Sequence, residues 1–278
     1  MKERYCVLMS VYHGEKAEHL REACESMLSQ TVPPSQFVLV CDGELTPELD
    51  EVISLLSKKA GDVLEVVRCK ENRGLARALN AGLDHCRYEL VARMDSDDIS
   101  FPERCSCQLA AMKKHEADIC SATIAEFETD PAVTVSYKTL PRTHEEILRY
   151  ARTRNPFNHP CVMFRLSAVR AVGGYDDYRF FEDYQLWVRM LQNGARGYNL
   201  RRPLLHMRTG SGMFARRGGK AYLGYARKME RYKLSTGFCS RWEYLKRMGA
   251  FTVFCLAPTR IREKLYRSFL RKKEKKEN

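Results

Sequence analysis

Three carboxylates stand within four positions in the segment RMDSDDISFPER (93–104), directly after the apolar run ELVA. Asp95, Asp97 and Asp98 repel one another at neutral pH, and this repulsion lowers stability unless a cation compensates it. Hard divalent cations prefer carboxylate oxygens, and one or two carboxylates leave coordination positions free for phosphate. Alternation along extended backbone predicts Asp95 and Asp97 on one side and Ser96 on the other. The segment therefore predicts a divalent-cation site, with Asp98 supporting the turn.

A helix cap is the alternative for the same acids. Asp98 or Ser100, ahead of Pro102, would serve as the N-cap of the helix that we predict over 104–115. One acid is enough for a cap, and three acids therefore favour the metal site.

A second acidic pair lies in FFEDYQLWVRM, where Glu182 and Asp183 begin a predicted helix with an apolar inner face. Compensation of the helix dipole is one role for such a pair. The other is a general base that takes a proton from an acceptor hydroxyl. Phe180, Phe181 and Tyr184 predict partial desolvation of the pair, which raises the pKa of a carboxyl group.

Glycine follows Asn72 and Arg73 in ENRGLARALNAGL, and Gly74 leads into a predicted helix N-terminus. Backbone N–H groups at such a terminus can bind an anion. The segment lacks the glycine spacings of phosphate-cradling and dinucleotide-binding loops. An ordinary loop-to-helix turn would have the same residues, and both interpretations stay open.

His159, between two prolines in NPFNHP, is predicted in an extended loop, with a structural or a catalytic role. The run HMRTGSGMFARRGG (206–219) has the composition of a mobile loop that closes on a diphosphate, or of a solvated basic linker. Its charged residues are His206, Arg208, Arg216 and Arg217.

Strands and helices alternate along the first hundred residues. Apolar runs predict strands at 5–11, 37–41, 63–67 and 89–94, and apolar spacing predicts helices at 15–30, from 47 onward and at 72–83. This order predicts a parallel sheet covered on both faces. Ligands of such sheets bind at the carboxyl ends of the strands, where we expect Asp42, Asn72 and Asp95.

The remainder of the chain is predicted to continue as mixed α/β structure and to end in helices. The predicted elements are a helix at 104–115, a strand at 117–127, a helix near 143–152, a loop entering a strand at 155–169, a glycine turn and helix within 172–194, and, from about 218, helices separated by Gly237 and Pro258.

Composition indicates one main domain with an appendage and an anionic partner. The chain has 278 residues, 44% of them hydrophobic, enough for one substantial core. Residues 1–200 carry 25 Lys/Arg against 30 Asp/Glu, and residues 201–278 carry 22 against 5. The basic tail suggests a phosphorylated ligand, nucleic acid or an anionic membrane as its partner. No helix-turn-helix, zinc-ligand spacing or aromatic platform accompanies the charge, which disfavours nucleic acid.

The eleven cysteines include no CxxC pair and lie mostly in apolar runs, as expected in a reducing cytoplasm. The N-terminal residues do not resemble a signal peptide, and the apolar stretch 250–257 is far shorter than the roughly 20 residues of a spanning helix. We therefore expect a cytoplasmic protein that is soluble or peripheral on the inner face of the cell membrane.

Six segments, taken in order, resemble the family 2 glycosyltransferases of the GT-A fold, particularly the bacterial enzymes that build capsule, exopolysaccharide and O-antigen repeats. The segments are SVYHGE, VCDGELT, NRGLARALNAGL, RMDSDDISFPER, NPFNHPCVMFRLSAVRAVGGYDD and FEDYQLWVRM. The resemblance covers residues 5 to about 210. It implies a Rossmann-like, mixed but mostly parallel sheet flanked by helices. The implied division is a nucleotide-binding half (1–100), an acceptor-binding half (101–215) and a helical basic extension (216–278).

The resemblance also implies roles for individual residues. The nucleotide-sugar would be bound by Ser10, Val11, Tyr12, Asp42, Asn72, Arg73, Gly74, Asp95, Ser96 and Arg208. Asp95 and Asp97 match the DxD pair, the first near the ribose and the second on Mg²⁺ or Mn²⁺. Asp183 matches the inverting base, with His159 and Glu182 on the acceptor side.

The activity implied is inverting, metal-dependent transfer of one sugar from a UDP-hexose or UDP-N-acetylhexosamine to a hydroxyl of a lipid-linked or oligosaccharide acceptor. The QxxRW motif of processive synthases is missing, which favours transfer of a single sugar, and Cys41 stands where many relatives have a second Asp. A sugar-phosphate nucleotidyltransferase is the alternative, although Gly14 alone follows the first strand where that class needs a glycine-rich signature. The basic amphipathic stretch 242–273 would rest on an anionic membrane or pack on the core.

Overall fold

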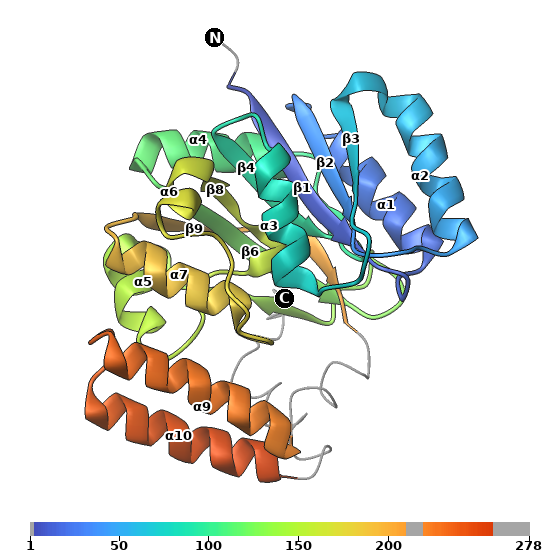
Figure 1. Cartoon of the computed structure of the whole chain (residues 1–278). Helices are drawn as coiled ribbons and strands as arrows, with labels where there is room; N and C mark the ends of the chain where they lie inside the picture. The colour runs from blue at the N-terminus through green and yellow to red at the C-terminus, as the bar shows by residue number, and fades with distance from the viewer. Residues whose placement is uncertain (1–2, 210–218, 258–278) are drawn as a thin grey trace.

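A mixed sheet forms the centre of the protein in a computed structural model that describes residues 3–209 and 219–257 (Figure 1). Within these ranges the strand order is β3-β2-β1-β4-β8-β6-β9-β5, and β7 pairs with β6. The strands are β1 (Tyr5–Val11), β2 (Gln36–Cys41), β3 (Leu64–Arg68), β4 (Leu90–Asp95), β5 (Ile99–Ser100), β6 (Ile119–Phe127), β7 (Ser136–Lys138), β8 (Met163–Arg165) and β9 (Gly197–Arg208).

The first four strands pair in parallel, as their continuous apolar character predicts. Every residue of β2 is buried, because helices cover both faces of the sheet. One face packs against α1 (Ala17–Leu28), α2 (Pro47–Ala60) and α4 (Arg104–His115). The other packs against α3 (Leu75–His85), α5 (His144–Ala151), α6 (Leu166–Ala171) and α7 (Glu182–Gln192). The predicted α/β architecture is thus confirmed.

Strand β9 is the main element that the sequence did not predict. It pairs with β6 in parallel and with β5 in the opposite direction, and the β6 ladder is irregular next to Thr123, which pairs with Pro203. Proline cannot donate a ladder hydrogen bond, so the run GYNLRRPLLHMR does not look like a central strand. The predicted loop at 206–219 is wrong for residues 206–208, which complete β9, whereas Arg216 and Arg217 lie outside the described residues.

The predicted loop entering a strand at 155–169 is confirmed in part, since residues 155–158 are irregular and a strand follows, but the strand is short and lies between two further elements. In order, these short elements are the 3₁₀ turn η2 (His159–Cys161), the three residues of β8, and the start of α6. A further 3₁₀ turn, η1 (Gly61–Val63), leads from α2 into β3. The extended conformation predicted for His159 is therefore wrong, because His159 begins this tight turn and Pro160 lies within it.

Two helices, α9 (Gly219–Ser235) and α10 (Arg241–Leu256), form a C-terminal hairpin beside α5 and α7 (Figure 1). Ser240 and Glu243 form a capping box that starts α10, and Gly237 turns the chain at φ +71°. Buried aromatic and aliphatic side chains of α7 and α9 join the hairpin to the rest of the chain. None of the described helices is long and apolar enough to cross a membrane.

Close packing of α3 on the sheet yields a stability prediction. A Cβ added at Gly82 would collide with the Leu8 Cδ1 and lie 2.7 Å from the Val40 Cγ2. We expect Gly82→Ala to lower the free energy of unfolding by about 1–3 kcal/mol through overpacking, measured by urea denaturation. In the control Gly224→Ala, on α9, nothing lies within 4 Å of the added Cβ, and a gain of about 0.5–1 kcal/mol is expected. Equal effects of the two substitutions would contradict this account.

Candidate active site

The carboxyl ends of β1, β2 and β4 bring the predicted donor-side residues to one edge of the sheet. Ser10 is in register with both Val40 and Asp95, and the strands are parallel. Tyr12, Asp42 and the acids after Asp95 therefore leave the sheet together. Tyr12 is exposed, with 43% of its surface accessible, whereas Asp42 is buried.

Asp42 holds the loop that precedes α3. Its two carboxylate oxygens accept hydrogen bonds from the backbone N–H groups of Arg73 and Gly74, each at 2.9 Å. The close approach requires glycine at position 43, because a Cβ there would lie 2.6 Å from the Asn72 nitrogen and φ is +87°. Asp42 thus shapes this edge by fixing residues 72–74.

The acidic cluster consists of Asp95, Asp97 and Asp98, which place one carboxylate oxygen each within 4.8 Å of one another. The predicted alternation along extended backbone is wrong here, because β4 ends at Asp95 and Ser96 and Asp97 lie in a turn. The Ser96 hydroxyl donates to Glu15 Oε2 at 3.1 Å, and the charge of Glu15 also contributes to the raised pKa of Asp97. The helix-cap alternative is wrong, since Glu103 immediately precedes α4 and neither Asp98 nor Ser100 caps it.

Asp98 does more than support the turn that follows β4. Its Oδ1 accepts a hydrogen bond from the Arg208 backbone at 2.9 Å, and its Oδ2 is buried with no hydrogen-bond partner in the described structure. An unpartnered buried carboxylate oxygen is costly in a protein interior. Three carboxylates with a free buried oxygen match the donor set that a hard divalent cation requires.

Burial and mutual repulsion alter the ionisation of the cluster. Burial, followed by the charge of Asp95, raises the pKa of Asp97 to about 7. Burial, followed by the charge of Asp97, raises the pKa of Asp98 well above its usual value. A nearby divalent cation would reverse both effects, because it favours the ionised carboxylates.

Arg93 is a fully buried cation beneath the cluster that the sequence analysis missed. It forms an ion pair with Asp95, two residues along β4, while its Nε and Nη1 are buried without a partner in the described structure. Its charge stabilises the ionised forms of Asp97 and Asp98 on one side and of Glu182 and Asp183 on the other. The i, i+2 spacing of Arg93 and Asp95 was the available signal.

Helix α7 supplies the second carboxylate pair. Asp183 Oδ2 accepts from Asn155 Nδ2 at 2.5 Å, and Asp183 Oδ1 accepts from the Tyr184 backbone at 2.7 Å. Burial raises the pKa of Asp183, although these two hydrogen bonds oppose the shift. Burial, followed by the charge of Asp183, raises the pKa of Glu182 to about 7. Carboxylates with raised pKa in a desolvated position are suited to proton transfer.

The aromatic surroundings of this pair differ in part from expectation. Phe181 and Tyr184 are buried, whereas Phe180 is 38% exposed and has φ of +68°, in the left-handed region. Phe180 therefore does not contribute to the burial of Glu182 and Asp183. Its ring lies against Tyr222 and Tyr225 of α9.

His159 is buried and interacts with aromatic residues. Its Nε2 lies 3.0 Å from the hydroxyl of Tyr175, and its ring packs edge-on against Trp187. Burial, followed by the charge of Arg93, lowers the pKa of His159 well below its usual value. The imidazole is therefore neutral in this environment, close to Arg93.

Arg208 braces the acidic segment instead of extending from a loop. Its backbone donates to Asp98, its Nε donates to the Asp97 carbonyl at 3.2 Å, and its Nη2 contacts Glu22 at 2.8 Å. The guanidinium also lies 4.7 Å from the centre of the Phe127 ring.

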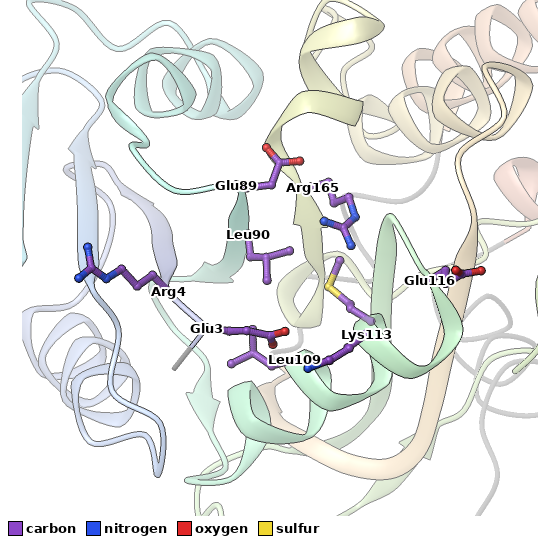
Figure 2. A pocket seen from close by; sticks show the side chains of 9 residues that line it. Glu3, Arg4, Glu89, Leu90, Leu109, Lys113, Glu116 and Arg165 are labelled. Atoms are coloured by element: carbon purple, nitrogen blue, oxygen red, sulfur yellow. The ribbon is translucent and has the colours of Figure 1, made fainter. Parts of the chain in front are cut away.

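A hollow of about 540 Å³ lies at the other end of the sheet (Figure 2). Its lining residues precede or begin β1 and β4, or come from β8 and α4; they include Glu3, Arg4, Leu90, Lys113 and Arg165. These are the amino ends of the parallel strands, opposite the acidic cluster. Charges of both signs line the hollow, and we do not assign it to the active site.

Comparisons with known proteins all indicate the same family. The family model "Glycosyl transferase family 2" matches residues 6–173. A glycosyltransferase of Haemophilus influenzae that is named as uncharacterized is 38% identical over 97% of this chain and 100% of its own length. The amylovoran biosynthesis glycosyltransferase AmsE of Erwinia amylovora is 36% identical over 94% and 97%. The UDP-Gal:alpha-D-GlcNAc-diphosphoundecaprenol beta-1,3-galactosyltransferase of Escherichia coli is 33% identical over 97% of both chains.

Solved structures support the GT-A fold at low sequence identity. The mannosyltransferase PcManGT of Pyrobaculum calidifontis, in complex with GDP-Man and Mn²⁺, superposes with a TM-score of 0.65 at 15% identity, over 97% of this chain and 76% of that one. TarS of Staphylococcus aureus gives 0.64 at 18% identity, over 96% of this chain and 44% of that longer one. The family match favours transfer of a sugar over the nucleotidyltransferase alternative. Since the family model covers more than half of the chain and close relatives span nearly all of it, the chain belongs to glycosyl transferase family 2 and is a glycosyltransferase.

Proposed function

We propose that the enzyme transfers a single sugar, with inversion, from a nucleotide-sugar to a hydroxyl of a lipid-linked or oligosaccharide acceptor during synthesis of a bacterial surface polysaccharide. The observation that carries this proposal is that two sets of acids lie near Arg93. The acidic cluster is suited to binding a cation, and the pair Glu182 and Asp183 is suited to accepting a proton. The amylovoran and diphosphoundecaprenol relatives support the acceptor class.

The donor would occupy the carboxyl edge of β1, β2 and β4. Ser10, Val11 and Tyr12 would hold the nucleotide base together with the loop 72–74 that Asp42 fixes. UDP-hexose or UDP-N-acetylhexosamine is the proposed donor, in line with TarS structures that contain UDP and UDP-GlcNAc. Ser96 and Arg208 support this side by tying the acidic segment to Glu15 and Glu22.

Asp95 and Asp97 would hold Mg²⁺ or Mn²⁺, with Asp98 as a third oxygen donor. Bound there, the cation would neutralise the negative charge that develops on the departing diphosphate. The Mn²⁺ in the PcManGT complex supports this cofactor class. Residues 1–100 would thus form the donor half, and residues 101–215 the acceptor half.

Asp183 would act as the base on the acceptor side. The acceptor oxygen attacks the anomeric carbon, the bond from that carbon to the phosphate oxygen breaks, and the proton of the hydroxyl passes to Asp183. Glu182 and His159 would line the acceptor side, with His159 held neutral by its burial and by the charge of Arg93, and with its Nε2 3.0 Å from the Tyr175 hydroxyl.

Replacement of the base tests this mechanism. We expect Asp183→Asn to reduce kcat by about 10²- to 10⁴-fold, because the amide cannot accept the proton, while the affinity for UDP stays within twofold. The measurement is release of nucleoside diphosphate in the presence of acceptor, with calorimetric titration of UDP. Glu182→Gln is the matched control and should keep substantial turnover. If Glu182→Gln is the inactive variant and Asp183→Asn is active, the base is Glu182.

The outer face of α10 supports a peripheral position at the inner face of the cell membrane. Trp242, Leu245, Val253 and Leu256 are 59–68% exposed, and their spacing places them on one face of the helix. Lys246 lies 5.1 Å from the centre of the Trp242 ring. Apolar side chains beside cations are typical of helices that rest in a lipid interface. Leu265, Phe269 and the terminal basic run lie outside the described residues.

Vesicle flotation tests the membrane contact. We expect the protein to float with anionic phosphatidylglycerol vesicles at low salt and much less at 1 M salt, because each cation near such a surface contributes about 1 kcal/mol that salt screens. Trp242→Glu with Val253→Glu should abolish flotation, whereas Leu55→Glu, at an exposed leucine of α2, should not. No flotation of the wild type at either salt concentration would remove this part of the proposal.

A further inference from the structure

Lys233 of α9 is a buried lysine whose three N–H donors all have acceptors. Its side chain is 0% exposed, and Nζ lies 2.9 Å from Glu230 Oε1, 3.0 Å from the Tyr184 hydroxyl and 3.0 Å from the Arg152 carbonyl. Glu230 is 1% exposed. Removing two charges from water is expensive, and well-packed apolar residues often stabilise as much as a buried pair does. A specific geometric role is therefore the better explanation for this pair.

Two of the acceptors of Lys233 belong to the segments that hold Asp183. Tyr184 follows Asp183 directly, and its N–H donates to Asp183 Oδ1 at 2.7 Å. Arg152 lies three residues before Asn155, whose amide donates to Asp183 Oδ2 at 2.5 Å. The lysine ammonium thus connects the segment 152–155 with Tyr184, and these two segments supply the N–H donors to both oxygens of this carboxylate.

Further contacts fasten the same two segments to each other and to the hairpin. The Tyr184 hydroxyl donates to the Ala151 carbonyl at 2.6 Å, joining α7 to the end of α5. The Arg152 guanidinium donates to Glu243, the acidic member of the capping box of α10, at 2.9 Å. Residue 152 is therefore held through its carbonyl by α9 and through its side chain by α10.

We propose that Lys233 is a positioning residue for Asp183, and that through it the C-terminal hairpin sets the orientation of the carboxylate that accepts the proton. This inference rests on the proposed function, in which Asp183 is the base. A base must lie within hydrogen-bond distance of the acceptor hydroxyl, and a displacement of about 1 Å can cost about 100-fold in rate. The hairpin is then a part of the active site and not an appendage to it.

The double variant Glu230→Met, Lys233→Met tests the inference. Both charges are removed together, because Lys233→Met alone would leave Glu230 buried with only Arg247, at 3.8 Å, as its cationic partner. We expect kcat to fall by about 10- to 100-fold, with the donor KM and the UDP affinity within twofold of the wild type, because the donor edge is formed by β1, β2 and β4. Hydrogen exchange at residues 153–158 and 182–185 should become faster.

Two further variants separate positioning from general stability. Tyr184→Phe keeps the ring and removes only the hydroxyl that receives Lys233, so a smaller loss of kcat in the same direction is expected even if the double variant fails to fold. Lys228→Met is the matched control on the same helix. Lys228 donates to the Asp177 carbonyl at 2.9 Å, outside the segments bonded to Asp183, and its loss should leave kcat and exchange unchanged.

The inference is overturned if the folded double variant keeps kcat within twofold and exchange at 153–158 and 182–185 is unchanged. It is also overturned if Lys228→Met lowers kcat as much as the double variant does. Failure of the proposed function would have a different outcome, namely full turnover in Asp183→Asn or no transfer by the wild type. Exchange would then still decide whether Lys233 holds the two segments.

Discussion

Repulsion among three carboxylates at the end of β4 is the constraint on which the rest of the site depends. Asp95, Asp97 and Asp98 each place one carboxylate oxygen within 4.8 Å of the others, and the fully buried Arg93 lies beside them. The charge of Arg93 alone does not balance the three carboxylates, and the raised pKa of Asp97 reflects burial together with the charges of Asp95 and Glu15. A divalent cation that also binds a diphosphate would offset this excess negative charge. The electrostatic cost of the acidic cluster is thereby related to the proposed chemistry.

The surrounding structure keeps the carboxylates together despite their repulsion. Arg208, at the end of β9, binds the backbone at Asp97 and the side chain of Asp98, while Glu15 holds Ser96. In our proposal the hairpin α9–α10 performs a comparable task for Asp183, through the buried contacts of Lys233 with Tyr184 and the Arg152 carbonyl. Both groups of acids are therefore fixed by elements distant in sequence, as preorganised electrostatic catalysis requires.

Local patterns in the sequence predicted the sheet, the acidic edge and most helices, because apolar runs and helical spacing depend on neighbouring residues. Strand β9 was missed because Pro203 and two arginines interrupt its apolar pattern, and it forms only by pairing with β6 and β5. Asn155 and Lys233 were missed for the same reason, because their partners lie on other elements and no local signal identifies them as parts of the site. Arg93 did have a local signal, its i, i+2 spacing from Asp95 on β4, but its complete burial depends on the elements packed around that strand.

Calorimetric titration of UDP tests the central claim most directly when it is done first with about 2 mM Mn²⁺ and then with a chelator in its place. The account predicts that Mn²⁺ strengthens UDP binding at least about tenfold in the wild type, that Asp97→Ala loses this gain, and that Asp62→Ala, at an exposed acid of η1, retains it. Equal UDP affinity with and without Mn²⁺ in the wild type, or an undiminished gain in Asp97→Ala, would contradict the assignment of the acidic cluster to a cation and a diphosphate.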